Sequence, residues 1–345
     1  MYKAENEILT QYSALYKTYK YLLERQDNIS GFYKECSPKR ITFIGSGSSL
    51  SLCKSTALSA KLRLDIDTNV IAAGDLMMNF EFYENMIRNS LIIIPSRSGS
   101  TSEVLLAVKT AKQKLGLKSI SICAVEHSEL SKLSDVNLAL PWAFDESICQ
   151  TRTVTNLYTA NLMLIAIITG DTYLIEEIGK AIEIGDDLLN NIMPDIKRLG
   201  EGKWENAVVL ADAELEGIAE EGALAFKEIC QRQSNYYHIL DVRHGPMVII
   251  NEKTLVIIAL TPYGRKYQED IIYDLKAKGC TVITVGNGIE AASYGDYGVE
   301  LPAFKNYAVN GIPFILVPQM LTLHKALAEG INPDRPEGLN PWIKL

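Results

Sequence analysis

Ile41-Thr42-Phe43-Ile44 runs directly into Gly45-Ser46-Gly47-Ser48-Ser49, and a helical pattern follows from residue 50 to about residue 64. A short apolar run that ends in glycine and serine before a helix is typical of a buried parallel strand and its turn. The unit recurs where residues 91–94 lead into Pro95-Ser96-Arg97-Ser98-Gly99-Ser100-Thr101-Ser102, with a helix expected at 103–115. Strands and helices that alternate in this way predict a parallel sheet covered by helices on both faces.

The second half of the chain repeats this alternation. Strands are expected at 206–210, 254–260 and 281–285, and helices at 219–230, 268–278 and 311–328. Three elements of the two halves overlay at offsets of 161 to 164 residues: 91–94 on 255–258, 120–123 on 282–285, and Leu140-Pro141 on Leu301-Pro302. A nearly constant offset favours a tandem duplication of one α/β domain.

This organisation predicts five parts in a chain of 345 residues. An N-terminal helix falls within 1–34, a first α/β domain within 35–170, a helical linker within 171–203, a second α/β domain within 204–330 and a C-terminal tail within 331–345. Gly31 is expected in a short loop, and Pro194 is expected to interrupt the linker, because proline breaks helices.

Composition argues against several classes of protein. The chain has 34 Lys and Arg against 42 Asp and Glu, a net charge of −8, which argues against a dedicated nucleic-acid binder. Its six cysteines are far apart and form no CxxC pair, so neither a zinc cluster nor a disulfide scaffold is expected. The apolar stretches are shorter than the roughly 18 residues of a membrane span, and no signal peptide is recognised. A cytoplasmic protein without a membrane or nucleic-acid partner is therefore expected.

Both serine-rich turns of the first half are candidate phosphate sites. In parallel sheets such turns lie beyond the carboxyl ends of the strands, where helix N-termini present N–H groups, and Arg97 can add a charged fork. Neither turn is a Walker loop or a dinucleotide fingerprint, because the final Lys-Ser/Thr and the last glycine are missing. Serine is also a common N-cap, so plain capping is the alternative for either turn alone. Two such turns in one domain favour phosphate binding.

The remaining candidate residues lie in a third turn and in the second half. Residues 145–153 precede a long apolar helix, and are either a helix entry capped by Thr151 or Thr153 or a wall that contacts a sugar. The second half lacks glycines after its first strand but has Glu221 and Glu228 at helical spacing, followed by Arg243-His244-Gly245-Pro246. A carboxylate that moves a proton between adjacent carbons, with a histidine acting on a ring oxygen, suits aldose–ketose chemistry. The alternative for Glu228 is a solvated helix face.

At these residues the chain resembles the sugar isomerase (SIS) domain family in its two-domain form, over roughly residues 35–340. EGALAFKEIC at 221–230 followed by RHGP is similar to EGALKLKEI and KHGP in the isomerase half of glucosamine-6-phosphate synthase. SRSGSTSE resembles the family's SxSGxT phosphate loop, and GSGSS resembles its first serine loop. The Arg in SRSG, the 151–156 stretch and the RHGP turn resemble relatives that deaminate or isomerise amino-sugar phosphates. The resemblance implies two tandem flavodoxin-like parallel-sheet domains, each a three-layer α/β/α unit.

The resemblance also implies roles for particular residues and no metal or cofactor. Glu228 would be the base that moves a proton between carbons 1 and 2, and His244 would open the ring from across a homodimer interface. Thr151 would contact the sugar. The phosphate would be held by Gly47, Ser48, Ser49, Ser96, Arg97, Ser98 and Thr101.

Two positions depart from the family pattern. Ala225 stands where the synthase has a lysine on the helix of the base, and Pro341 stands where it has a C-terminal lysine, with Lys344 nearby as a possible lid over the site. Both changes favour a different substrate or direction, and a chain without the glutaminase domain is expected to run toward release of the amine.

We therefore expect a phosphosugar isomerase that acts on an amino-sugar 6-phosphate or a sugar–amine 6-phosphate conjugate, with isomerisation coupled to loss of the amine. Deamination, deglycation and plain aldose–ketose isomerisation remain open. The alternatives are a non-catalytic module that senses a phosphosugar, and a two-lobed solute-binding protein, which would need a secretion signal.

Overall fold

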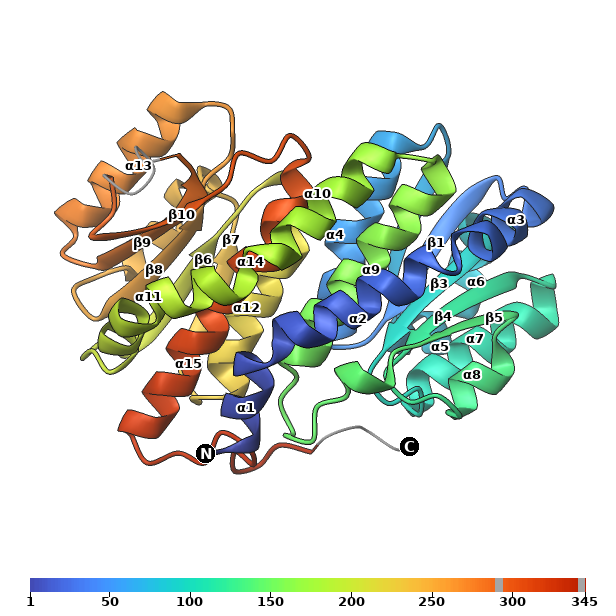
Figure 1. Ribbon diagram of the computed structural model, residues 1–345, viewed down its shortest axis with the longest axis horizontal. Coiled ribbons are helices and arrows are strands. Elements are labelled where there is room, and N and C mark those ends of the chain that lie inside the picture. The colour runs from blue at the N-terminus through green and yellow to red at the C-terminus, as the bar shows by residue number, and fades with distance from the viewer. Residues whose placement is uncertain (289–293, 341–344) are drawn as a thin grey trace.

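The computed structural model describes residues 1–288, 294–340 and 345, and it contains two five-stranded sheets, one in each half of the molecule (Figure 1). The first has the order β2-β1-β3-β4-β5, and the second the order β7-β6-β8-β9-β10. All neighbouring strands are parallel, so both sheets show the 2-1-3-4-5 order of flavodoxin-like folds. The strands are β1 (Arg40–Gly45), β2 (Asp67–Ala72), β3 (Ser90–Ser96), β4 (Lys118–Cys123), β5 (Val136–Ala139), β6 (Asn206–Leu210), β7 (Gln233–Tyr237), β8 (Thr254–Ala259), β9 (Thr281–Asn287) and β10 (Tyr297–Leu301).

The overlay expected from the sequence joins strands at equal places in the two sheets. Residues 91–94 and 255–258 lie in β3 and β8, the third strands, and 120–123 and 282–285 lie in β4 and β9, the fourth strands. Leu140 follows the fifth strand of the first sheet, and Leu301 ends the fifth strand of the second. The two halves therefore share strand order and spacing.

Each sheet is covered on both faces, because alternate strand residues enter different cores. The inner faces share one continuous core with α4 (Ser48–Arg63), α9 (Arg152–Thr169), α12 (Glu216–Glu228) and α15 (Leu316–Ala328), which lie between the sheets (Figure 1). The outer face of the first sheet packs on α7 (Ser102–Leu115), with α5 (Ala73–Met78), α6 (Phe80–Ile87) and α8 (Glu129–Leu133) nearby. The outer face of the second packs on α13 (Arg265–Ala277).

The two halves meet most closely where α4 crosses α12. Gly217 lies so near α4 that a Cβ atom would come within 1.9 Å of the Ser51 carbonyl oxygen. The Ser55 Oγ accepts a hydrogen bond from the Ile218 N–H at 3.0 Å, which ties the start of α12 to α4. Glycine and serine thus replace bulky side chains at the crossing and let the helix backbones approach.

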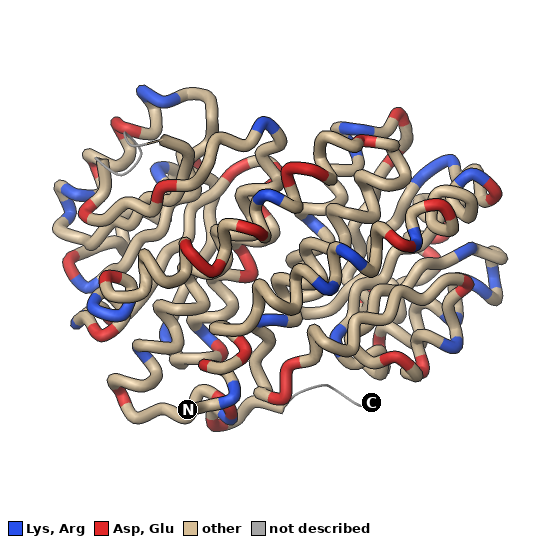
Figure 2. Tube along the Cα trace, in the orientation of Figure 1, with Lys and Arg blue, Asp and Glu red and all other residues tan. Residues whose placement is uncertain are grey.

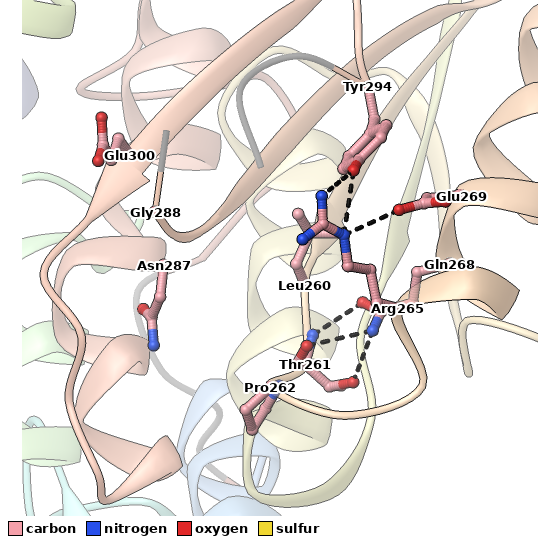
Figure 3. Close-up of a pocket in the computed structure, with 10 residues that line it drawn as sticks. All are labelled: Leu260, Thr261, Pro262, Arg265, Gln268, Glu269, Asn287, Gly288, Tyr294 and Glu300. Carbon is pink, nitrogen blue, oxygen red and sulfur yellow. Dashed lines mark hydrogen bonds and ion pairs between the residues drawn. The ribbon is translucent and has the colours of Figure 1, made fainter. Parts of the chain in front are cut away.

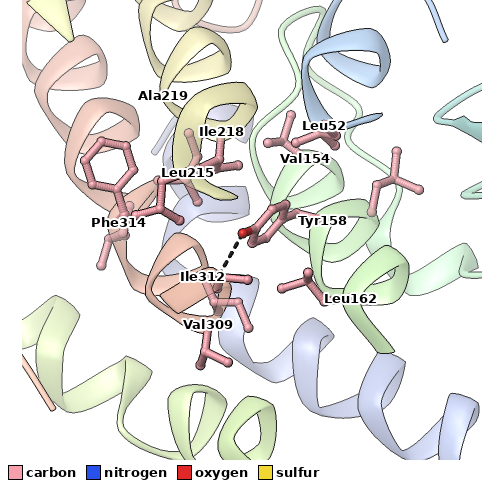
Figure 4. Packing of buried hydrophobic residues seen from close by; sticks show 14 of the residues in the cluster. Leu52, Val154, Tyr158, Leu162, Leu215, Ile218, Ala219, Val309, Ile312 and Phe314 are labelled. Carbon is pink, nitrogen blue, oxygen red and sulfur yellow. Dashed lines mark hydrogen bonds between the residues drawn. The ribbon is translucent and has the colours of Figure 1, made fainter. Parts of the chain in front are cut away.

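A second crossing is formed by α9 and α14 (Gly311–Phe314) (Figure 4). The fully buried Tyr158 donates its hydroxyl to the Ala308 carbonyl at 2.7 Å, and a Cβ at Gly311 would come within 2.4 Å of the same hydroxyl. The aromatic ring therefore fills the space that a missing side chain leaves.

Two local expectations from the sequence are wrong. Gly31 lies within α3 (Gln26–Cys36), which follows α1 (Lys3–Leu9) and α2 (Gln11–Leu23), and Pro194 lies inside α11 (Gly185–Gly200), which follows α10 (Thr172–Glu183). The helix continues through Pro194 because its buried face, with Leu189, Ile192 and Ile196, packs into the shared core. Tertiary packing outweighs the local cost of proline here.

One helical segment, 307–328, is longer and more apolar than we expected from the sequence. Its 22 residues would suffice in length and composition for a membrane span, but 83% of its apolar window is buried inside the protein. Burial of this kind is typical of a core helix.

The α4–α12 crossing can be tested with one methyl group. Gly217→Ala should lower the free energy of unfolding by about 1–3 kcal/mol, because the added Cβ overlaps a backbone oxygen that cannot move away cheaply. The matched control is Gly31→Ala, a helical glycine whose Cβ would meet nothing within 4 Å, and which should gain up to about 1 kcal/mol. Urea unfolding measures both, and equal effects would contradict the close crossing.

Candidate active site

The two serine turns of the first half lie side by side, because β1 and β3 are neighbours in the sheet. Gly47, with φ of +55°, precedes α4, and Ser48 and Ser49 form the first turn of that helix with about 5% of each side chain exposed. Parallel strands end at the same edge, so hydroxyls and helix N-termini from both turns meet there.

The turn after β3 is held by its own hydroxyls and by a close contact. Ser96 Oγ accepts from the Gly99 N–H at 3.0 Å, and Ser98 Oγ accepts from the Ser100 N–H at 3.2 Å. Gly99 has φ of +59°, and a Cβ there would lie 2.2 Å from Ser128 Oγ, so the position requires glycine. Thr101 is the half-buried residue before α7 and makes no side-chain cap.

The α4–α12 crossing brings two carboxyl groups of the second half to these turns. Burial together with the charge of Glu228 holds the pKa of the buried Glu221 well above its usual range, and the nearby Ser48 hydroxyl opposes this shift. Burial also raises the pKa of Glu228, whereas the charge of Arg97 lowers it. The predicted base and the predicted phosphate loop therefore lie within electrostatic reach of each other.

Arg97 lies inside the protein rather than at its surface. Only 5% of the residue is exposed, and its Nη1 donates to the carbonyl oxygens of Ser147 at 3.0 Å and Ile148 at 2.9 Å. Burial lowers the pKa of the guanidinium, and the charges of Asp145, Cys149 and Glu228 oppose that shift. Arg97 thus joins the turn after β3 to the turn at 145–150.

Thr151 occupies the N-cap position of α9, one of the two alternatives expected from the sequence. Neither Thr151 nor Thr153 caps α9 through its hydroxyl. Instead the Asp145 carboxylate accepts the N–H groups of both threonines, each at 2.8 Å. A carboxylate at a helix N-terminus also interacts favourably with the helix dipole. Thr151 is fully buried, and its hydroxyl has no hydrogen-bond partner among the described residues.

His244 lies apart from this cluster on an exposed turn. Its ring makes no hydrogen bond or ion pair with the described part of the chain, and Gly245 follows with φ of +126°. Apolar side chains beside it are exposed, with Val248 81% and Ile249 55% accessible. Ala225, where the synthase has a lysine, is buried on α12.

Two residues of the predicted tail, Pro341 and Lys344, lie outside the described residues. The Leu345 N–H donates to Ser102 Oγ at 3.1 Å, at the first residue of α7, directly after Thr101.

A separate pocket of about 610 Å³ lies at the carboxyl ends of β8 and β9 (Figure 3). Arg265 points between Glu269 and the Tyr294 hydroxyl there, with nitrogen–oxygen distances of 2.9 and 3.0 Å. None of the predicted site residues lines it. The candidate active site is therefore defined by buried side chains between the two halves and not by this pocket.

Acidic and basic residues alternate over both halves, as Figure 2 shows. No single-sign stripe of the kind that tracks a nucleic-acid backbone is visible along the described chain in this view.

Comparison with known proteins identifies the first half of the chain. Residues 36–168 match the SIS domain family. The chain contains a SIS domain. This SIS domain carries both serine turns, Arg97 and most of α9, whereas Glu228 and His244 lie outside the matched span.

Relatives with similar sequences extend over more of the chain than the SIS domain. A D-galactosamine-6-phosphate deaminase, AgaS, from Shewanella sp. (strain ANA-3) is 28% identical over 319 residues, covering 86% of this chain and 77% of that protein. A glutamine–fructose-6-phosphate aminotransferase from Pyrococcus horikoshii is 27% identical over 280 residues, covering 76% of this chain. The match covers only 45% of that aminotransferase, so the chain spans about half the length of such relatives.

Solved structures with the same fold cover the whole chain. Glucosamine-6-phosphate deaminase from Thermotoga maritima superposes with a TM-score of 0.85 and 25% identity, over 99% of this chain and 100% of that one. Tagatose-6-phosphate ketose/aldose isomerase from Escherichia coli gives a TM-score of 0.86 at 22% identity, over 99% and 97% of the two chains. The SIS domain is therefore part of an arrangement that recurs in other two-sheet proteins.

The buried Asp145 predicts how stability changes with pH. Burial and the charge of nearby Glu7 raise the pKa of Asp145 to about 7, whereas an unfolded aspartate titrates near 3.8. Between about pH 4 and pH 7 the folded state binds more protons than the unfolded state, so the raised pKa makes the free energy of unfolding fall as pH rises. The free energy of unfolding of the wild type minus that of Asp145→Asn should fall as pH rises over that interval. At higher pH this difference should stay constant.

Urea unfolding of both proteins at a series of pH values provides the measurement. Parallel curves for wild type and Asp145→Asn from pH 4 to about pH 7 would contradict the assignment of this titration to Asp145.

Proposed function

We propose that this protein is a cytoplasmic phosphosugar isomerase that acts on an amino-sugar 6-phosphate or a sugar–amine 6-phosphate conjugate, and that it couples aldose–ketose isomerisation to loss of the amine. The observation that carries the proposal is that Glu228 of the second half lies within electrostatic reach of Arg97 of the first, while Glu221 on the same helix lies beside Ser48. The names of the relatives, a galactosamine-6-phosphate deaminase and a glucosamine-6-phosphate deaminase, support the same class of substrate.

In this proposal the first half binds the phosphate. Serine hydroxyls and the N–H groups at the starts of α4 and α7 supply short hydrogen bonds to a dianion, and Arg97 supplies positive charge from the turn after β3. The buried hydroxyl of Thr151 faces the sugar. The phosphate holds the reactive carbons of the open-chain sugar toward α12.

Glu228 then moves one proton. For a 2-amino aldose, its carboxylate removes the proton at carbon 2, and the electron pair forms an enolamine as the carbonyl oxygen at carbon 1 is protonated. Return of the proton to carbon 1 leaves an imine at carbon 2, which water hydrolyses to a ketose phosphate and ammonia. For a 1-amino ketose the same transfer runs from carbon 1 to carbon 2 and ends in an aldose phosphate and the free amine. This proton transfer needs neither a metal ion nor a cofactor.

The environment of Glu228 suits a general base. Burial raises the pKa of its carboxyl toward the range where proton transfer at neutral pH is efficient, and the charge of Arg97 keeps the ionised form accessible. Glu221 lies on the same face of α12, where burial and the charge of Glu228 hold its pKa well above its usual range.

Glu228→Gln tests the base. We expect turnover to fall by about 10²–10⁴-fold, because the amide cannot accept the proton, while binding of the sugar phosphate is retained. The panel of substrates to be assayed consists of galactosamine, glucosamine, fructosamine and tagatose 6-phosphates. Product formation is measured by detecting ammonia or amine and by a ketose assay. A ligand at a hundred times its dissociation constant adds about 2.7 kcal/mol of stability, so thermal shift reports binding.

The matched control is Glu220→Gln, on the same helix, where the carboxylate pairs with Lys54 at 2.9 Å. Its turnover should equal that of the wild type. Equal turnover by Glu228→Gln and the wild type would refute the catalytic assignment, and binding without turnover by the wild type across the whole panel would favour the phosphosugar-sensing alternative.

We propose further that two copies of the chain complete each site, with His244 supplied by the second copy as the ring-opening group. The exposed His244 has no partner in the described part of its own chain, and the apolar side chains of Val248 and Ile249 beside it are mostly exposed. Exposed apolar groups next to a functional residue are typical of an interface.

A mixture of two inactive variants tests the shared site. Glu228→Gln and His244→Ala should each be inactive alone, but random pairing should restore about a quarter of wild-type activity, because one site of each mixed dimer holds both native residues. Co-refolding at a series of ratios, followed by activity assays, makes the measurement. Absence of rescue at every ratio, with dimers present by size-exclusion chromatography, would show that each chain completes its own site.

A further inference from the structure

The carboxylate of Glu7, on the N-terminal helix α1, is buried against the turn at 146–148, whose carbonyls bind Arg97. Glu7 is only 2% exposed, and its Oε1 accepts the N–H groups of Glu146 at 2.7 Å and Ser147 at 3.1 Å. Its Oε2 accepts the Ser147 hydroxyl. Three donors from two consecutive residues thus converge on one side chain that is 139 positions away in the sequence.

The opposite side of the same turn holds Arg97. The carbonyl oxygens of Ser147 and Ile148 accept Arg97 Nη1, so Glu7 binds the N–H groups and Arg97 binds the carbonyls of one short segment. Ser147 is the residue that both groups share: Glu7 binds its N–H and its hydroxyl, and its carbonyl accepts Arg97. The position of the guanidinium therefore depends on Glu7 through Ser147.

A second contact keeps α1 and the turn in register. The Asp334 carboxylate accepts the N–H groups of Lys3 at 3.0 Å and Ala4 at 2.8 Å, and the Asp334 carbonyl accepts the Ile148 N–H at 3.0 Å. One residue near the end of the chain thereby ties the start of α1 to the turn that Glu7 binds. The arrangement leaves α1 little freedom to shift relative to Arg97.

We propose that Glu7 is a positioning residue of the phosphate site, which acts by holding the 146–148 segment so that Arg97 faces the bound sugar phosphate. The inference rests on the proposed function, in which Arg97 contributes to phosphate binding. A carboxylate accepts these groups in charge-assisted hydrogen bonds, which are stronger than those a neutral glutamine can form at the same position.

A double-mutant cycle tests the inference, with glucosamine 6-phosphate as the probe. Calorimetry measures the dissociation constant of the probe for four proteins: wild type, Glu7→Gln, Arg97→Gln and the double variant. Arg97→Gln should weaken binding by about tenfold or more, the size of one charge-assisted hydrogen bond. Glu7→Gln should weaken binding severalfold in the wild type but by less than twofold in the Arg97→Gln background, because its effect passes through Arg97.

The outcomes separate the two proposals. Unchanged binding in Arg97→Gln would refute the phosphate role of Arg97 and with it this part of the proposed function. Two results would overturn only the positioning role, provided that Arg97→Gln weakens binding. One is unchanged binding in Glu7→Gln, and the other is an equal effect of Glu7→Gln in the wild-type and Arg97→Gln backgrounds.

Two further variants keep the test independent of folding. Glu5→Gln, on the same helix with a side chain that bonds only the Tyr2 N–H, should bind the probe as the wild type does. Ser147→Ala removes one of the three donors to Glu7 without changing any charge, and should weaken binding only when Arg97 is present. If Glu7→Gln yields no folded protein, Ser147→Ala is measured with Arg97 present and in the Arg97→Gln background. Weaker binding only when Arg97 is present supports the positioning role, and an equal effect in both backgrounds overturns it.

Discussion

The close approach of α4 and α12 is the contact on which the candidate site depends. Without a side chain at Gly217, the backbone of α12 reaches the Ser51 carbonyl, and the helix that carries Glu221 and Glu228 comes down beside the first residues of α4. A carboxyl from one half then lies against the serine turn of the other. A larger residue at the crossing would separate groups that the proposed chemistry needs together.

The two halves share a topology but differ at the turn after their first strand. In the first half this turn holds glycines and serines at the start of α4. In the second half Asp212 occupies the corresponding turn, where its carboxylate accepts the Ile239 N–H and contacts His238 Nδ1. A negative charge at that place disfavours a phosphate, so of the two corresponding turns only the first suits the proposed phosphate site.

The sequence was sufficient to predict the central strands and the serine turns, but not the edge strands β2 and β7 or the contacts that support the candidate site. Strands such as β3 and β8 are buried along their whole length and therefore form uninterrupted apolar runs. The edge strands β2 and β7 each bury a single residue, so they leave no such run and were not predicted. Glu228 and the turns could be found because their residue types suit phosphosugar chemistry. The role of Asp145 as the helix cap depends on contacts that no local pattern shows, and Glu7 binds a segment far away in the sequence.

The hydrogen bonds from Lys3 and Ala4 to Asp334 have a consequence for the order in which the protein can be completed during synthesis. Ala4 is translated 330 residues before Asp334, whose carboxylate accepts its N–H group. Until then α1 lacks the acceptor for its leading N–H groups, and an isolated helix of seven residues is not stable in water. The nascent chain can therefore assemble both sheets before the segment around Ser147 acquires its final support, so this segment becomes ordered late in folding.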